Sequence, residues 1–383
     1  MEEQPSPRVS LKILAIYVSL GFVVLASGGI AWAAMSVEPP KQLWVAAPET
    51  KAPLPAPAPQ AQVAKTISLS AVGDIIMGDA PQSMPANDGK GFFDNVKHLF
   101  PADLVMGNME EPITDDTGHV KCSPEQTRCN QFRVPPSYAQ HLKDAGFHLL
   151  NQANNHGYDY GPKGYANTQK ALEAVGLKHT GAKGQITLVD VQGIKVAVLG
   201  FSSYPRDNSL IDIAAAKAVV QKAAALATVV VIQVHWGAEG ADQTHVKPGT
   251  EMFLGENRGD PIAFSHAVID AGADLIIGHG PHTLRAMEVY KGRLIAYSLG
   301  NFAGGKGLKG EGNLGWGGVL KATVNSEGAL VAGHFASTYY NTHPGVPMPD
   351  PQNRGLNLMR DLSKQDFPSS GARFSVSGEI STL

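Results

Sequence analysis

The sequence predicts an α/β fold in which two mixed β-sheets pack between layers of helices. Three observations support this prediction. Between residues 66 and 340, short apolar runs typical of strands alternate with helical stretches. Several neighbouring runs are joined by tight turns, as in hairpins. Polar residues follow many of the apolar runs directly. The alternation predicts parallel β-α-β units, and the hairpins add antiparallel strands.

The elements follow this pattern in order along the chain. The runs "SLSAV" and "DLVM" predict two strands, residues 137–146 a helix, and "FHLLN" a third strand. Residues 164–176 predict a helix that ends at its last glycine. The further elements are three hairpins at 186–201, 286–300 and 317–336, and two helices at 213–227 and 261–273, each feeding a strand.

The N-terminal part of the chain predicts export. Residues 13–37 contain no charged side chain, which is long enough for a helix across a hydrocarbon core of about 30 Å. Arg8 and Lys12 precede it, so residues 1–12 are expected to be a cytoplasmic tail. A cleaved signal peptide is the alternative, because Ala31-Trp32-Ala33 resembles a cleavage site. As an anchor, the segment predicts a single-pass protein of the cell membrane, and both interpretations place the folded domain outside the cytoplasm.

The remaining domain boundaries follow from composition. Residues 38–65 are rich in proline and alanine and predict an extended linker. The folded domain is expected at 66–340, and residues 341–383, which lose periodicity, are expected to form a loosely ordered tail. The formal net charge is −3 and no dense basic run occurs, so there is no electrostatic case for nucleic acid binding.

The chain has only two cysteines, Cys122 and Cys129, in a polar segment. An exported compartment permits disulfides, so we expect these residues to form one. Two free thiols are the alternative. A zinc site is disfavoured, because no second pair of ligands lies nearby in the sequence.

Polar residues of the kinds that bind ligands follow five of the predicted strands. In open α/β sheets, ligands bind beyond the carboxyl ends of the strands. We therefore expect the five strand ends to lie along one edge of the sheet. A single polar strand end is usually structural, whereas five together favour a binding site. They are Asp74, Asn108 with Glu110, Asn155 with His156, His235, and His279 with His282.

This set of side chains fits a divalent metal. Imidazole, carboxylate and amide groups together favour Mn, Fe or Zn, as one or two ions. A pair of ions needs a bridging carboxylate, for which Glu110 is the candidate. His156 is expected to stay unligated as a catalytic general acid or phosphate contact, beside the amide ligand Asn155. The other predicted ligands are Asp74, His235, His279 and His282.

Two acidic residues near these motifs have open roles. Asp159 is expected to hold the loop after His156, with direct metal ligation as the alternative. Glu239 is expected to orient His235 or to contact substrate.

Five segments of the chain resemble the successive motifs of one known family. They are "GDIIMGD", "GNMEEPIT", "NQANNHGYDYG", "HWGAEG" and "GHGPHTLRAMEVYKGRLIAYSLGNF", within residues 67–302. They resemble the CapA family of poly-γ-glutamate capsule synthesis proteins, a branch of the calcineurin-like metallophosphoesterases. The resemblance implies a four-layer α/β/β/α sandwich of the metallo-dependent phosphatase type with a dinuclear-type site. It matches the same metal residues, with Glu110 in the bridging position and His156 as the catalytic imidazole.

Two departures from the phosphoesterase pattern affect the expected site. The D-x-H motif reads Asp74-Ile75-Ile76, so its histidine is missing, and the bridging aspartate is replaced by the longer Glu110. A one-metal site and a metal site used only for binding are both compatible with these changes.

Together with the predicted anchor, the resemblance implies a membrane-anchored extracytoplasmic protein that acts in synthesis or export of an anionic polymer of the poly-γ-glutamate type. It would be a metallophosphoesterase-like hydrolase or transferase. Its expected partners are the polymer, the membrane and other subunits of a synthesis complex, but not nucleic acid. The alternatives are an exported metal-dependent phosphodiesterase or phosphatase, and a non-catalytic scaffold of a polymer-synthase complex.

Overall fold

The computed structural model describes residues 65–123, 125–126, 129–305, 308–341 and 345–381. The predicted cytoplasmic tail and membrane segment, and the linker up to residue 64, lie outside these residues. Among the residues that are described, no helix is both long enough and apolar enough to cross a membrane.

The larger sheet is mixed and has ten strands in the described residues, in the main order β18-β19-β16-β15-β1-β2-β3-β4. Its central strand β1 (Thr66–Ile75) is parallel to β2 (Leu104–Met109) and antiparallel to β15 (Trp316–Asn325). The other strands are β3 (Leu149–Asn151), β4 (Lys178–Thr180), β14 (Asn301–Ala303), β16 (Leu330–Tyr339), β17 (Met348–Pro349), β18 (Arg373–Phe374) and β19 (Glu379–Ser381).

The smaller sheet has seven described strands, in the main order β12-β13-β11-β8-β6-β5. They are β5 (Thr187–Val191), β6 (Ile194–Ser202), β7 (Asn208–Ser209), β8 (Val229–His235), β11 (Leu275–His279), β12 (Met287–Tyr290) and β13 (Arg293–Ala296). A separate hairpin joins β9 (Met252–Phe253) to β10 (Glu256–Asn257). The three predicted hairpins are confirmed as the pairs β5–β6, β12–β13 and β15–β16.

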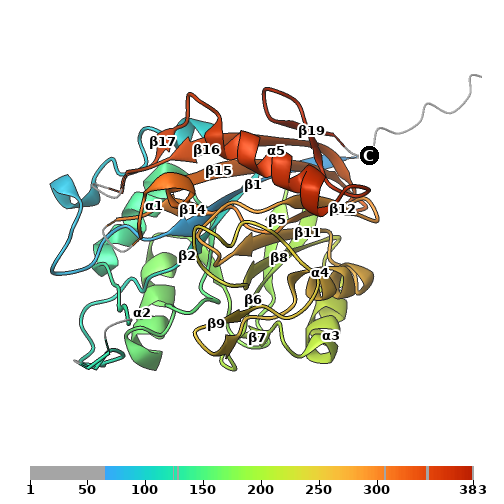
Figure 1. Cartoon of the computed structure of the whole chain (residues 1–383). Helices are drawn as coiled ribbons and strands as arrows, with labels where there is room; N and C mark the ends of the chain where they lie inside the picture. Colours follow the sequence, from blue (N-terminus) through green and yellow to red (C-terminus); the bar gives the residue numbers. More distant parts are fainter. Residues whose placement is uncertain (1–64, 124, 127–128, 306–307, 342–344, 382–383) are drawn as a thin grey trace, which may run out of the picture. The chain divides into compact units, whose positions relative to one another are not determined.

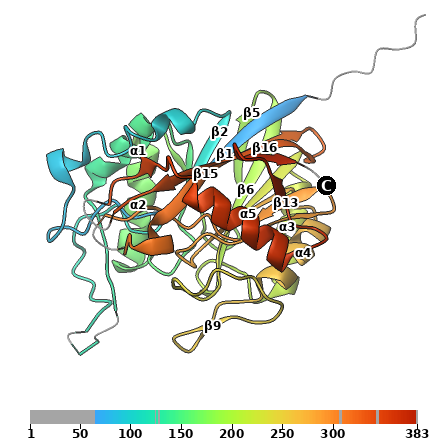
Figure 2. The same cartoon turned by 45° about the horizontal axis from the view of Figure 1, so that its top comes forward.

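Three apolar cores define the layers, and Figures 1 and 2 show the sheets and helices that they join from two directions. One core lies between the sheets, where side chains such as Leu69 and Val231 are buried. A second core lies between the larger sheet and the helices α1 (Ala139–Ala145) and α2 (Gly161–Ala174). A third joins the smaller sheet to α3 (Ile213–Ala224) and α4 (Pro261–Asp270). The predicted mixed α/β fold with more than one sheet is therefore confirmed, with its layers in the order helix, sheet, sheet, helix.

Short 3₁₀ helices complete the described elements. They occur at Ala86–Gly89, Lys97–Leu99, Pro136–Tyr138 and Gly312–Gly315.

The expectation of a loosely ordered tail at residues 341–383 is wrong for the part that is described. Helix α5 (Arg354–Asp366) packs Leu356 and Met359 into the core between the sheets and Leu362 into the outer core of the smaller sheet. It thereby covers β15, β16 and β12 (Figure 1). These three apolar residues recur every three positions, which is a helical pattern. The proline- and glycine-rich segment before them concealed it.

Candidate metal centre

The candidate site lies where the carboxyl ends of the two sheets meet. β1, β2 and the loop after β3 belong to the larger sheet, while β8, β11 and the loop after β11 belong to the smaller one. The expectation of five tips along one edge is therefore wrong, because two sheets supply them. In this order, the elements place Asp74, Glu110, Asn155 with His156, His235, His279 and His282.

The strand register brings the polar residues level with one another. Asp74 pairs with Asn108 of β2, and His279 pairs with His235 of β8. Gly73 allows the chain to pass closely at this point, since a Cβ there would lie 1.9 Å from the backbone oxygen of Gly300. Only glycine tolerates such an approach, so this glycine helps to fix the position of Asp74.

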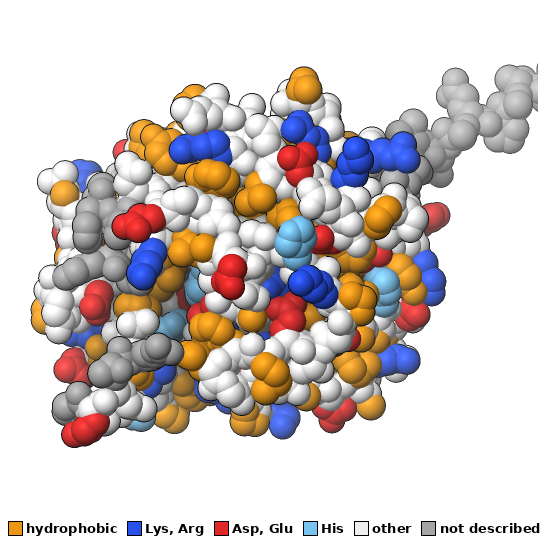
Figure 3. Space-filling model, viewed as in Figure 1, with side chains coloured by type: hydrophobic (Ala, Val, Ile, Leu, Met, Phe, Trp, Pro, Cys, Tyr) orange, Lys and Arg blue, Asp and Glu red, His pale blue; other side chains and the backbone are white. Residues whose placement is uncertain are grey.

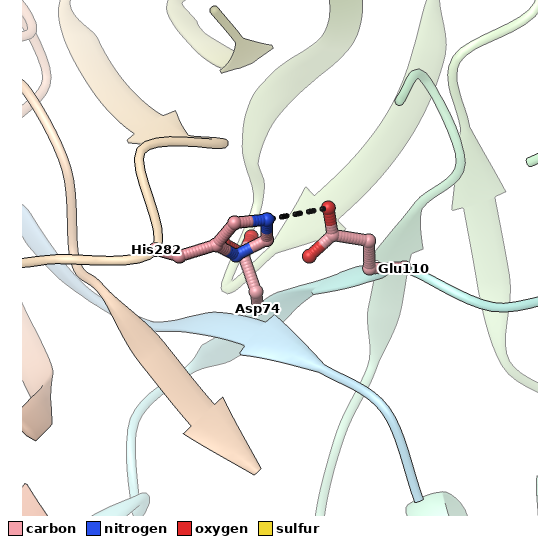
Figure 4. A group of neighbouring side chains, drawn as sticks. All are labelled: Asp74, Glu110 and His282. Carbon is pink, nitrogen blue, oxygen red and sulfur yellow. Dashed lines mark ion pairs between the residues drawn. The ribbon is translucent and has the colours of Figure 1, made fainter. Parts of the chain in front are cut away.

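Asp74, Glu110 and His282 form the centre of the cluster, and Figure 4 shows the imidazole between the two carboxylates. One possible ligand atom from each lies within 4.8 Å of the others. His282 Nδ1 is 3.3 Å from Asp74 Oδ2, and its Nε2 is 3.7 Å from Glu110 Oε1. His282 has a φ of 60°, a left-handed conformation that is rare outside glycine and often marks functional sites. These three buried side chains could hold a metal ion.

Two more predicted ligands approach the same carboxylates from the smaller sheet. His235 Nε2 is 2.9 Å from Glu110 Oε1, and His279 Nδ1 is 3.5 Å from Asp74 Oδ1. Both imidazoles are fully buried. The structure therefore brings five of the six predicted ligands into direct contact.

Asn155, the sixth, lies at the margin of the cluster. Its Nδ2 donates a hydrogen bond of 3.5 Å to Glu239 Oε1, and Glu239 Oε2 is 3.6 Å from His282 Nε2. Glu239 thus connects Asn155 to the cluster through His282, whereas the sequence predicted that it orients His235 or contacts substrate.

Four buried polar atoms of the site have no hydrogen-bond partner among the described residues, and their chemistry tests whether the site fits a metal. Each such atom costs about 1–3 kcal/mol unless something binds it. Oxygen and imidazole nitrogen are the donor types that divalent metals take. The residues present therefore fit a divalent cation. Among the described residues, no hydrogen-bond partner exists for Glu110 Oε2, Asn155 Oδ1, His235 Nδ1 or His279 Nδ1.

Burial keeps two of the imidazoles neutral. It lowers the pKa of His235 to about 3 and that of His279 to about 4, although the Asp74 carboxylate opposes both shifts. Neutral imidazole is the form that coordinates metals.

The centre of the cluster is strongly charged. Burial alone would lower the pKa of His282, but the acidic groups around it, first Glu110, raise it well above its ordinary value. Burial would likewise raise the pKa of Asp74, yet His282 holds that pKa well below its usual range. Burial, and after it the neighbouring Asp74, raise the pKa of Glu110 well above its ordinary value. A positive charge on His282 is therefore stabilised next to Asp74, which marks this position as one that favours a cation.

His156 lies beside the cluster and contacts none of its carboxylates directly among the described interactions. Its Nδ1 is 2.8 Å from Asp159 Oδ2. Asp159 also accepts a hydrogen bond from the backbone N–H of Phe132 and forms an ion pair with Lys121. Asp159 therefore holds the His156 ring itself, whereas the sequence predicted that it holds the loop after His156. Burial lowers the pKa of His156, and Asp159 partly opposes this shift.

Two cavities, each of about 350 Å³, share His156 and Glu239 in their walls. The first has apolar walls from Phe132, Leu308 and Leu314 and also contains His282 and Asn301. The second is lined by the cations Lys121, Arg206 and Arg258, together with Asn155 and Tyr204. The first cavity also contains Lys309, so apolar and polar side chains mix in its wall, whereas three cations line the second.

Sequence reasoning missed several of these residues. Gln233 Oε1 is 3.2 Å from His279 Nε2 and holds that ring. The signal was a glutamine inside the apolar run "VVVIQV", two positions before His235 and hence on the same face of β8. Arg206 and Arg258 had no comparable signal, since each belongs to a loop. Lys121 precedes Cys122, and the predicted Cys122–Cys129 disulfide is confirmed.

Comparison with known families decides which family the chain represents. Residues 68–306 match the family model described as bacterial capsule synthesis protein PGA_cap. The chain belongs to this family. It is 31% identical over 334 residues to the PGA biosynthesis protein CapA of Bacillus subtilis (strain 168), covering 78% of both chains. It is 32% identical over 265 residues to the capsule biosynthesis protein CapA of Bacillus anthracis, covering 62% of this chain and 59% of the relative.

A solved structure of the 5'-nucleotidase precursor from Thermus thermophilus is 14% identical, with a TM-score of 0.41. It covers 73% of this chain and 56% of the other.

Proposed function

We propose that the protein is a membrane-anchored, extracytoplasmic, metal-dependent enzyme that cleaves or transfers an anionic cell-surface polymer of the poly-γ-glutamate type. The observation behind this proposal is the convergence of Asp74, Glu110 and His282 beside two cavities. Membership of the capsule synthesis family supports the polymer. The proposed anchor rests on the uncharged residues 13–37.

The predicted ligands would hold one or two ions of Mn, Fe or Zn, with Glu110 as the bridge in a pair. A bound ion would polarise the carbonyl oxygen of the bond to be cleaved and lower the pKa of a water molecule. The neutral rings of His235 and His279 and the carboxylate of Asp74 supply suitable donors without further rearrangement of charge.

His156 would handle the proton in this reaction. Cleavage of an amide link requires a proton for the departing amine. Asp159 occupies His156 Nδ1, so Nε2 is the atom left to take up and deliver a proton. Because His156 lines both cavities, this atom can reach a chain bound on either side.

The test incubates the full-length chain with γ-linked glutamate polymer and Mn²⁺, and follows polymer length by gel electrophoresis. We expect shortening or transfer that a chelator stops. Turnover of an aryl phosphodiester without any effect on the polymer would instead indicate a phosphodiesterase. If the chain held metal yet acted on neither, a scaffold role would replace the proposal.

Export is tested separately with reporter fusions after residue 66. We expect activity only outside the cytoplasm and retention in the membrane fraction. Reporter activity in the cytoplasm would contradict export, and release from the membrane would indicate a cleaved signal.

A further inference from the structure

Three cations line the second cavity, and they differ in how their charges are balanced. Lys121 forms an ion pair with Asp159, and Arg258 pairs with Glu239 and Glu256 at 2.9 Å each. Arg206 pairs with no carboxylate among the described residues. Of the three, it alone has a charge left for a bound anion.

The Arg206 guanidinium is nevertheless held firmly. It lies 4.6 Å from the ring centroid of Tyr158 and 4.4 Å from that of Tyr204. Such contacts with aromatic faces stabilise a cation and restrict its position. Its Nη2 donates a hydrogen bond of 3.0 Å to the backbone oxygen of Asn154. A preorganised arginine of this kind suits an oxyanion, which it can bind through two N–H groups.

Arg206 also has a hydrogen-bond donor that no described residue accepts from, and the neighbouring carboxylate does not pair with it. Its Nε is buried without a hydrogen-bond partner among the described residues. The adjacent Asp207 carboxylate accepts a hydrogen bond of 2.6 Å from Ser202 instead of pairing with the guanidinium. An unpaired buried donor is costly, so a ligand that accepts from it would stabilise the site.

The position of Arg206 connects it to the metal cluster. Asn154, its hydrogen-bond acceptor, directly precedes Asn155 and His156. An anion on Arg206 would therefore lie in the cavity that these residues also line. On the face in Figure 3, acidic and basic side chains are interspersed without a continuous patch of one sign. Attraction for an anionic chain at the second cavity would come from Arg206, whose charge has no carboxylate partner among the described residues.

We propose that Arg206 binds one free carboxylate of the polymer and so positions the chain beside the cluster. This inference rests on the proposed function. A γ-linked glutamate chain presents a carboxylate on every unit, separated by methylene groups. The first cavity offers apolar walls for those methylenes on the other side of His156 and Glu239. The chain would thus have binding positions on both sides of the cluster.

The test is calorimetric titration of full-length protein with a γ-linked glutamate pentamer. We expect Arg206→Gln to bind about tenfold to a hundredfold more weakly, since a charge-assisted contact is lost. The affinity of Arg206→Lys should lie between those of wild type and Arg206→Gln, because lysine keeps the positive charge but lacks the planar pair of N–H donors. A pentamer with amidated carboxyls should bind weakly to both wild type and Arg206→Gln. Metal content should be the same in all variants.

Arg354→Gln is the matched control. Arg354 also stacks on a tyrosine, with its guanidinium 4.8 Å from the Tyr339 ring, but it pairs with Asp350 and lines neither cavity. It should leave pentamer binding unchanged.

Each other outcome has a defined meaning. Wild-type affinity in Arg206→Gln would overturn the inference and leave the proposed function standing. If wild type bound no pentamer, the proposed function would fail, and titration with glutarate would decide the inference. Glutarate binding that depends on Arg206 would keep a carboxylate site, whereas its absence would overturn that site too.

Discussion

The two sheets contribute different chemistry to one cluster. The larger sheet supplies oxygen groups, the carboxylates of Asp74 and Glu110 and the nearby amide of Asn155. The smaller sheet and its loop supply the imidazoles of His235, His279 and His282. Neither sheet alone assembles a full set of ligands, so the packing of the two sheets creates the site.

The oxygen groups of the larger sheet (the oxygen side) and the imidazoles of the smaller sheet and its loop (the imidazole side) are also held differently. Asp74 accepts hydrogen bonds from Asn108 Nδ2 at 2.8 Å and from the backbone N–H of Gly280 at 3.3 Å. His279 has one side-chain hydrogen bond among the described residues, with Gln233, and burial keeps it neutral. The oxygen side therefore provides the charge that attracts a cation, and the imidazole side mainly provides geometry. Loss of an oxygen ligand should cost more than loss of an imidazole.

Glu110→Gln should have the largest effect. It removes a carboxylate in contact with both His235 and His282, and an amide is a poor bridge between ions. We expect dialysed protein to retain no metal and polymer cleavage to be lost, as measured by elemental analysis and gel assay. Glu111→Gln is the control, because Glu111 is an equally buried neighbouring carboxyl whose Oε1 accepts the backbone N–H of Met77 instead of contacting a cluster imidazole. Equal metal loss in both variants would refute a specific role for Glu110.

His156→Ala should lower cleavage about 10²- to 10⁴-fold while metal content stays unchanged. His156 lies in the loop after β3 of the larger sheet, yet it contacts Asp159 and none of the cluster carboxylates. Elemental analysis and rate measurements on the same sample separate the two effects. The exposed His98→Ala serves as control. Loss of metal from His156→Ala would mean that the ligand and proton-transfer roles are assigned wrongly.

His235→Ala should weaken metal binding by at least about a hundredfold, because loss of a direct ligand should cost more than the roughly 10–100-fold lost with an outer-shell partner. The protein should recover metal at higher concentrations, because the charged ligands remain. Titration with Mn²⁺ measures this shift. A complete loss as in Glu110→Gln would abolish the distinction between the two sides.

Gln233→Leu should have the smallest effect, about tenfold in metal affinity, because it removes only the group that orients His279. The same titration measures it. An unchanged affinity would show that the position of the His279 ring depends on burial alone.

The sequence predicted the parts of the site that local patterns encode. Apolar runs followed by Asp74, Glu110 and His235 identified strand ends, and strand ends gather at a sheet edge. It did not predict that two edges meet, because packing of sheets leaves no periodic signal. Arg206 was missed because it belongs to a loop, and only the folded chain brings it to Tyr158. Helix α5 did have a signal, but a proline-rich approach segment concealed it.

The most direct test is the metal content of the full-length wild-type chain, purified without chelator and analysed for Mn, Fe and Zn. The cluster predicts one or two equivalents of divalent metal, removed by chelation and restored by adding the ion. Orphaned atoms on Glu110, His235 and His279 should then be its ligands. Protein that holds no divalent metal as purified, and binds none on titration, would contradict the proposed metal centre.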